Sequence, residues 1–216
     1  MWLYFDFESD SWELIALLGF IENSIRAAHD EEQAALARFV NANPELLQES
    51  RWVGFIARHE PERIRRTFEE FRRLLLYGFI GTVCSIVETR LVELCKAVAR
   101  LDKLQEPAPP RRGVLEWAKE YMKDSLSLQV PSGQAWEAIM GLKNIRNAIV
   151  HEDGRMTRVL DQYAKRHQEH LELGEADRLN IRPAYGEYIV KKIVAFFEEL
   201  RSLNEGSFEK VPVRPA

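Results

Sequence analysis

The sequence predicts an all-α fold, a bundle of up-and-down helices with a helical addition at its N-terminus. Apolar residues recur three and four positions apart over long stretches, which is the spacing of one face of an α-helix. Short or proline-rich links join these stretches, as is typical of helical bundles. The chain has 216 residues, of which 46% are apolar, so it can bury a sizeable core.

The first 60 residues are expected to form the helical addition that packs on the bundle. An apolar stripe from Leu14 to Ile25 predicts a helix over residues 11–28, and a second helix is expected over residues 31–40. The Asn43-Pro44 pair is typical of the cap and first turn of a third, short helix.

Residues 61–205 are expected to form the bundle itself, and residues 206–216 a tail. Helical spacing is almost unbroken over residues 61–101, which predicts one long central helix. Three prolines between residues 104 and 113 exclude helix there and predict a stiff connector.

Four further helices and a small hairpin complete the predicted bundle. Helices are expected over residues 112–125, from a cap at Pro131-Ser132 to Gly154, over residues 156–170 and over residues 185–203; residues 171–173 and 179–181 flank a turn and predict a small β-hairpin.

Charge and cysteine content restrict the function classes. The net charge is -4, so any site for a polyanion must be local. The longest uncharged run, Leu74 to Val87, has 14 residues and is shorter than the roughly 20 that cross a bilayer, so no membrane segment is expected. Cys84 and Cys95 lie eleven positions apart on one predicted helix and cannot bond to each other. The acidic N-terminus and the lack of a cysteine framework favour a cytoplasmic protein.

The candidate site is the string from Asn144 to Gly154, NIRNAIVHEDG. On a helical wheel, Arg146 lies at the edge of the apolar stripe, whereas Asn147 and His151 lie on the opposite, polar side. One interpretation is structural: His151 interacts with the carbonyl groups at the helix end, and Arg146 extends its guanidinium to solvent.

The segment Arg146–His151, RNAIVH, also resembles the signature of the HEPN superfamily of all-α domains. The long helix with Ser85-Ile-Val-Glu88, the proline-rich connector, the lead-in from Leu142 and the glycine after the motif resemble this group as well. The resemblance covers about residues 62–203, and its motif is moderately specific.

The resemblance implies a metal-independent endoribonuclease that acts as a toxin or an anti-phage defence effector. His151 would be the general acid or base, Arg146 would bind the phosphate, Asn147 would orient it, and Glu88 would pair with Arg146. This chemistry suits the residue types, because His titrates near neutral pH and an Arg fork stabilises charge on phosphate oxygens.

Further expectations concern the surroundings of this site. Lys143 and Asn144, in the lead-in to the motif, are expected to contact substrate. Because Arg146 and His151 do not share a helix face, we expect a homodimer whose two-fold axis brings two copies of each residue into one RNA-binding cleft. No metal or cofactor is expected; His167 and His170 lack a further clear ligand.

The resemblance also implies a small nucleotidyltransferase-like antitoxin, or another defence-system partner, that neutralises the protein by modification, with Tyr163 a conceivable target. Seven arginines between Arg51 and Arg73 could follow an RNA backbone, although ion pairs along a solvated helix explain them better. Gly78 and Gly81 allow close approach of a helix, either across the dimer or inside the bundle. Two alternative functions stay open: a non-catalytic HEPN-like module that binds nucleotide, RNA or protein, and a purely structural helical scaffold.

Overall fold

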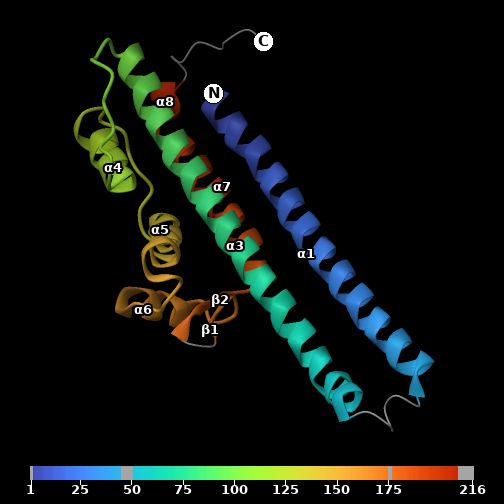
Figure 1. Ribbon diagram of the computed structural model, residues 1–216. Coiled ribbons are helices and arrows are strands. Elements are labelled where there is room, and N and C mark those ends of the chain that lie inside the picture. Colours follow the sequence, from blue (N-terminus) through green and yellow to red (C-terminus); the bar gives the residue numbers. More distant parts are fainter. Residues whose placement is uncertain (1, 45–50, 175–176, 209–216) are drawn as a thin grey trace.

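The computed structural model of the protein describes residues 2–44, 51–174 and 177–208. This part of the chain is helical apart from its links and one two-stranded antiparallel hairpin, which confirms the all-α prediction (Figure 1). The elements in order are α1 (Trp2–Ala42), α3 (Arg51–Leu101), α4 (Val114–Asp124), α5 (Gln134–Glu152), α6 (Arg158–Arg166), β1 (Leu171–Leu173), β2 (Leu179–Ile181), α7 (Pro183–Leu203) and α8 (Glu205–Phe208).

The N-terminal helix α1 is continuous, so the break expected between residues 28 and 31 is wrong. Its second half stays against α3: the His29 ring lies edge-on to Phe68 with centroids 5.5 Å apart, and Gln33 Nε2 donates to the Pro61 carbonyl at 3.4 Å. These contacts hold residues 29–33 against α3 within one continuous helix. The short helix expected after Asn43 falls mostly on residues 45–50, outside the described residues.

The central helix α3 begins ten residues earlier than predicted, at Arg51, and carries Pro61 inside it. The boundary expected near residue 60 therefore falls within a helix. By length and composition, His59–Leu101 could cross a membrane, a weak indication because core helices of soluble proteins meet the same criterion. One face of this segment packs in the protein core.

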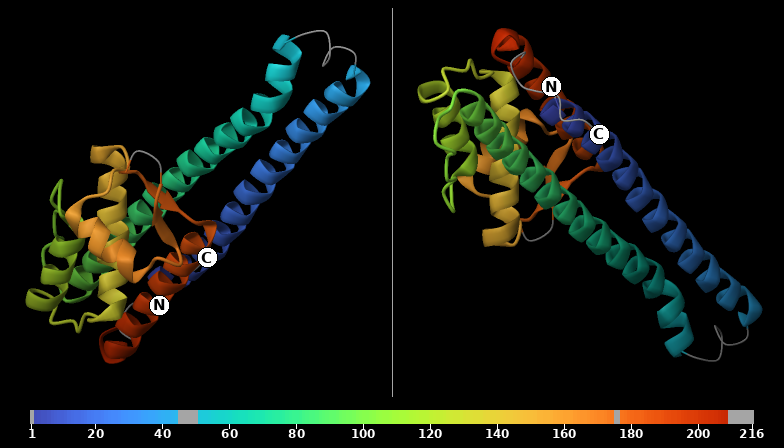
Figure 2. Two further views of the ribbon diagram at one scale, coloured as in Figure 1. Left: turned by 90° about the horizontal axis from the view of Figure 1, so that it is seen from below. Right: turned by 90° about the horizontal axis from the view of Figure 1, so that it is seen from above.

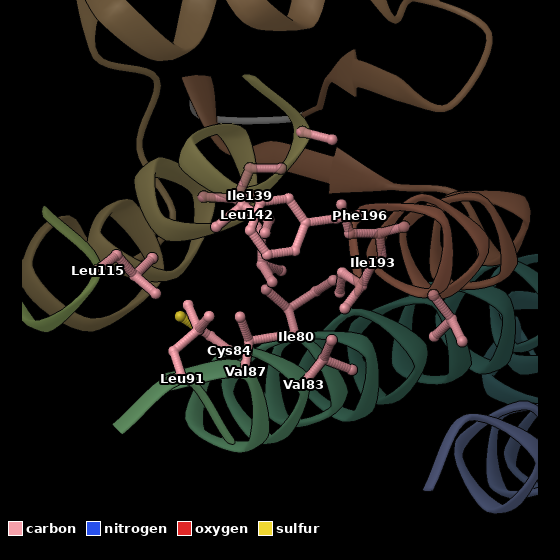
Figure 3. Close-up of a cluster of buried hydrophobic side chains, with 14 of the residues drawn as sticks. Ile80, Val83, Cys84, Val87, Leu91, Leu115, Ile139, Leu142, Ile193 and Phe196 are labelled. Atoms are coloured by element: carbon pink, nitrogen blue, oxygen red, sulfur yellow. The ribbon is translucent and has the colours of Figure 1, made fainter. Parts of the chain in front are cut away.

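The core lies where α3 meets α5 and α7. Figure 3 shows Ile80, Val83 and Val87 of α3 facing Leu142 of α5 and Phe196 of α7. All five side chains are fully buried. Burial of such side chains stabilises the fold by about 1.5–3 kcal/mol each, so this cluster holds the long helices together.

The helix ends in the bundle are defined locally. Gly113, with φ 69°, precedes α4, and Thr157 caps α6 by accepting a hydrogen bond from the Leu160 amide at 3.2 Å. The cap expected at Pro131-Ser132 is wrong, because α5 begins after Gly133, which has φ 63°. The predicted hairpin is confirmed, with Leu171 paired to Ile181.

The outer halves of the two longest helices extend beyond the bundle as a two-helix hairpin, seen in both views of Figure 2. We call residues 22–42 of α1 and 51–74 of α3 the arm. Of its described side chains, Ile25 and Ile64 are the buried apolar ones. The tail expected from residue 206 begins inside α8, and residues 209–216 lie outside the described part.

Candidate functional site

Helix α5 carries the whole candidate motif on its last three turns. Ala138, Leu142 and Ile145 are buried, as the helical wheel predicted, whereas His151 is exposed in the last turn. Arg146 is half-buried at the edge of the apolar face. The two charged candidates therefore lie on different faces of α5.

The end of α5 is fixed to the rest of the bundle. Asp153, with φ 53°, and Gly154, with φ 75°, both donate their amides to the Ala148 carbonyl and close the helix. The Tyr77 hydroxyl of α3 lies against Gly154, where a Cβ would overlap it, and donates to the Leu179 carbonyl at 2.7 Å. Because the Leu179 amide in turn donates to the Gly154 carbonyl at 2.8 Å, the segment after His151 is held by both α3 and the hairpin.

Arg146 contacts the acidic residue that the resemblance implies as its partner. Its Nη2 lies 3.8 Å from Glu88 Oε2 of α3, and its Nη1 donates to Asn147 Oδ1 at 3.0 Å. Both members of the ion pair are partly shielded, with side-chain exposures of 32% and 20%. Glu88 and Asn147 therefore hold the guanidinium from two sides.

The same arginine lines an open groove of about 770 Å³ that follows the outer side of α3. Arg146 and Val150 of α5 form one wall, and Asp10 of α1 belongs to the other. The floor is made by Gly78, Gly81, Thr82 and Ser85 of α3. His151 does not line this groove, so a single chain does not bring Arg146 and His151 into one pocket.

The far wall of the groove is fixed by a charge pair that sequence reasoning missed. Arg90 of α3 donates to Asp10 Oδ2 with Nε at 3.0 Å and Nη2 at 2.8 Å, and to Glu93 Oε2 at 3.0 Å. Arg90 and Asp10 are 80 positions apart in the sequence, so no local pattern could show their pairing. Asp10 lies well inside α1.

The expected substrate contacts, Lys143 and Asn144, lie away from the groove. Lys143 Nζ forms an ion pair with Glu116 of α4, and the Lys143 side chain is 19% exposed. Burial is the largest single effect and disfavours the charged carboxylate of Glu116. The hydrogen bond and positive charge of Lys143, together with a backbone hydrogen bond, outweigh burial and lower the pKa of Glu116. This lysine thus joins α4 to α5, and Asn144 beside it is half-buried.

The arginines on the α3 side of the arm whose side chains the structure describes are paired with glutamates. The pairs are Arg63 with Glu60, Arg65 with Glu62 and Glu69, Arg66 with Glu62, Arg72 with Glu22, and Arg73 with Glu70. The side chains of Arg51 and Arg58 lie outside the described residues. Among the described arginines, this pattern favours the interpretation as an ion-paired helix face over a track for an RNA backbone.

Other candidates have structural roles or are inaccessible. Tyr163 is buried, with its hydroxyl 3.4 Å from that of Tyr185, and burial raises its pKa to about 12, so its proposal as a modification target is wrong for the folded chain. His167 and His170 contact the rings of Tyr163 and Tyr188. Within the described residues, no group of three or more His, Cys, Asp or Glu side chains is placed to hold a metal ion.

No family model, curated protein or solved structure matches this chain. Its function must therefore be argued from the site and from the motif.

Proposed function

We propose that the protein is a metal-independent endoribonuclease of the HEPN type that acts in the cytoplasm as a toxin or an anti-phage defence effector. One observation carries the proposal: within the RNAIVH string, Arg146 is held 3.8 Å from Glu88 in the wall of a groove, and His151 is exposed on the anchored last turn of the same helix. The two residue types that RNA cleavage needs are thus held on one rigid element, and both keep access to solvent.

In this proposal the RNA supplies its own nucleophile. A base removes the proton of the 2′-OH, the 2′-oxygen attacks the adjacent phosphorus, and an acid protonates the departing 5′-oxygen, which leaves a 2′,3′-cyclic phosphate and a 5′-hydroxyl. His151 fills the acid or base role, and the Arg146 guanidinium stabilises the charge that develops on the phosphate oxygens. Asn147 and Glu88 orient that guanidinium.

The proposed catalyst is a homodimer. His151 does not line the groove of its own chain, and one imidazole cannot serve as acid and base at the same time without a second group. A two-fold partner supplies a second Arg146 and a second His151, and a cleft between the two copies accepts the RNA strand.

The decisive test incubates the purified protein with RNA in EDTA. We expect cleavage that leaves 2′,3′-cyclic phosphate ends and falls by at least about 100-fold in Arg146→Ala and in His151→Ala, because removal of one charge-stabilising or proton-transferring group costs about that much. Arg66→Ala and His59→Ala, which change the same residue types on the arm, are the controls and should cleave normally. Full activity in His151→Ala would refute the proposal.

Glu88 offers a finer test of the same site. Glu88→Gln keeps the shape of the side chain but removes the charge beside Arg146, so we expect weaker RNA cleavage with unchanged folding. Cleavage, stability and dimerisation that are all unchanged in this variant would exclude Glu88 as a partner that matters for Arg146.

A defence role predicts a phenotype and a partner. Expression of the wild-type chain should arrest growth, and Arg146→Ala or His151→Ala should relieve the arrest. A nucleotidyltransferase-like antitoxin, or another defence-system partner, would then be sought as a second gene product that restores growth with the wild-type chain.

The second candidate is a HEPN-like module that binds nucleotide, RNA or protein without cleaving it. The separation of Arg146 and His151 onto two faces of α5 favours this candidate, because a binding groove needs Arg146 alone. RNA binding that is lost in Arg146→Ala but kept in His151→Ala, without cleavage in either case, would identify it.

A further inference from the structure

The outer face of α3 carries a row of exposed apolar side chains that the proposed site does not explain. On this side of the helix no charge occurs from Thr67 to Thr89, and Phe71, Leu74 and Leu75 are 56%, 54% and 42% exposed. Figure 1 looks onto this face: α3 runs in front of α7, with α1 on one side and α5 on the other. Exposed apolar side chains in such a row mark a surface that another molecule covers.

This face carries a bulge of apolar side chains beside a hollow, and the two have complementary shapes. Phe71, Leu74 and Leu75 project from it, and the next two turns carry Gly78 and Gly81 on the groove floor. A Cβ added at either glycine would meet nothing within 4 Å, so packing inside the chain does not explain them. The bundle interpretation of these glycines is therefore wrong, and the hollow is empty space that a neighbouring side chain can fill.

The geometry points to a second copy of this chain as the occupant, with the two α3 helices antiparallel and crossing at Gly78. Such an axis places Leu75 of one copy opposite Gly81 of the other, and Leu74 opposite Thr82. Each bulge then enters the partner's hollow. Close helix approach at glycine is a general way to pack two helices tightly.

The charges at the two ends of this face agree with the antiparallel arrangement. Glu60, which pairs with Arg63 in its own chain, and Lys96 are each eighteen positions from Gly78 in opposite directions, which places them on one side of an ideal helix. An antiparallel pair centred on Gly78 sets Glu60 of one copy toward Lys96 of the other. A parallel pair would set like charges against each other.

The antiparallel α3 pair also affects the candidate site, and this part of the inference rests on the proposed function. A two-fold axis perpendicular to α3 keeps α5 of both copies on the same side of the helix pair. Arg146 lines the same groove as Gly78 and Gly81 and pairs with Glu88, ten positions from Gly78, so one arginine lies to either side of the axis on that shared side. The partner's α3 covers the groove floor, and the cleft proposed for RNA then lies between the two α5 helices and needs both copies.

The test is the mass of the full chain in solution, measured by sedimentation equilibrium across the micromolar range. We expect wild type to weigh twice 25.1 kDa, and Gly78→Leu to weaken association by at least about tenfold, because the added side chain fills the hollow. Gly78→Leu should fold normally, since its side chain meets open space and Leu favours helix more than Gly does. Gly19→Leu on α1, at another helical glycine with open space that does not line the groove, is the matched control and should stay dimeric.

A second variant adds a positive signal. Gly78→Cys should form a disulfide-linked dimer on mild oxidation, because the axis brings the two positions within the roughly 7 Å that a disulfide spans. The native thiols, Cys84 and Cys95, are buried, so they do not compete, and Gly19→Cys should stay unlinked.

A wild-type chain that is monomeric, or that binds lipid vesicles without self-association, overturns the inference. So does a dimer that Gly78→Leu leaves intact and Gly78→Cys fails to link. A dimer through this face that does not cleave RNA refutes the proposed nuclease and leaves the inference standing. RNA cleavage by a dimer that pairs through another face refutes this inference and supports the proposed nuclease.

Discussion

The two halves of helix α3 are stabilised in different ways. From Leu76 to Ala99 the helix packs against α1, α5 and α7, and its inner face is buried in the core. In the arm, Ile64 is its one buried apolar side chain among those described, and surface ion pairs such as Arg65 with Glu62 and Glu69 accompany it. Exposed pairs of this kind contribute little to stability, because water and salt screen the charges.

The difference teaches that continuous secondary structure does not mean uniform stability. Local opening is cheapest where few apolar contacts are lost, so the arm should open before the bundle does. The candidate site lies entirely on the bundle half, where Arg146, Glu88 and the end of α5 are held by packed elements.

The largest expected difference between the two regions is in how much the free energy of unfolding falls when an aromatic side chain is removed. Phe196→Ala in the core should lower the free energy of unfolding by about 3–5 kcal/mol, whereas Phe39→Ala on the arm, 48% exposed in the wild type, should change it by less than about 1 kcal/mol. Urea titration followed by circular dichroism measures both. Equal losses would mean that the arm is as tightly packed as the bundle.

Substitution of two glycines by alanine should change the stability of the protein in opposite directions. Gly154→Ala should destabilise the protein by more than about 1 kcal/mol, because φ is 75° there and the new methyl overlaps the Tyr77 hydroxyl. Gly19→Ala, on an open face of α1, should stabilise it by about 0.5–1 kcal/mol. Thermal denaturation of the two variants provides the comparison, and a stabilised Gly154→Ala would contradict the described end of α5.

The smallest expected effect is the response of the arm to acid. Hydrogen bonds from Arg65 and then Arg66 lower the pKa of Glu62 from 4.5 to about 2. A lowered pKa means that this contribution is complete above pH 4.5 and is lost as the pH falls toward 2. Far-ultraviolet circular dichroism should show a small loss of helix over this range, reduced in Glu62→Gln. Identical acid transitions in the two chains would show that these pairs do not support the arm.

The sequence predicted the elements whose signals are local. The periodicity of α3 and α7, the proline-rich connector and the turn of the hairpin all lie in adjacent residues, and these elements were predicted with errors of a few residues at most ends. The break in α1 expected between residues 28 and 31 is wrong, and the contacts of His29 and Gln33 with α3 that support the continuous helix join residues distant in the chain.

In the candidate site, too, local features were predictable from the sequence and contacts between distant residues were not. The faces of α5 follow from spacing alone, and the placement of Arg146 at the edge of the apolar stripe is confirmed by its half-burial. The support for the end of α5 by Tyr77 and the fixing of Asp10 by Arg90 join residues that are distant in the chain. The ion pair of Lys143 with Glu116 was missed for this reason, and the lysine was assigned to substrate instead.

The contact between Gly141 of α5 and the Tyr163 ring of α6 carries a consequence for how such chains can diversify. A methyl group at position 141 would overlap that ring, so a larger residue at 141 requires a smaller side chain at 163. Descendants of this sequence should therefore show coupled substitutions there, and a selection experiment that begins with Gly141→Ala should recover second-site revertants at Tyr163.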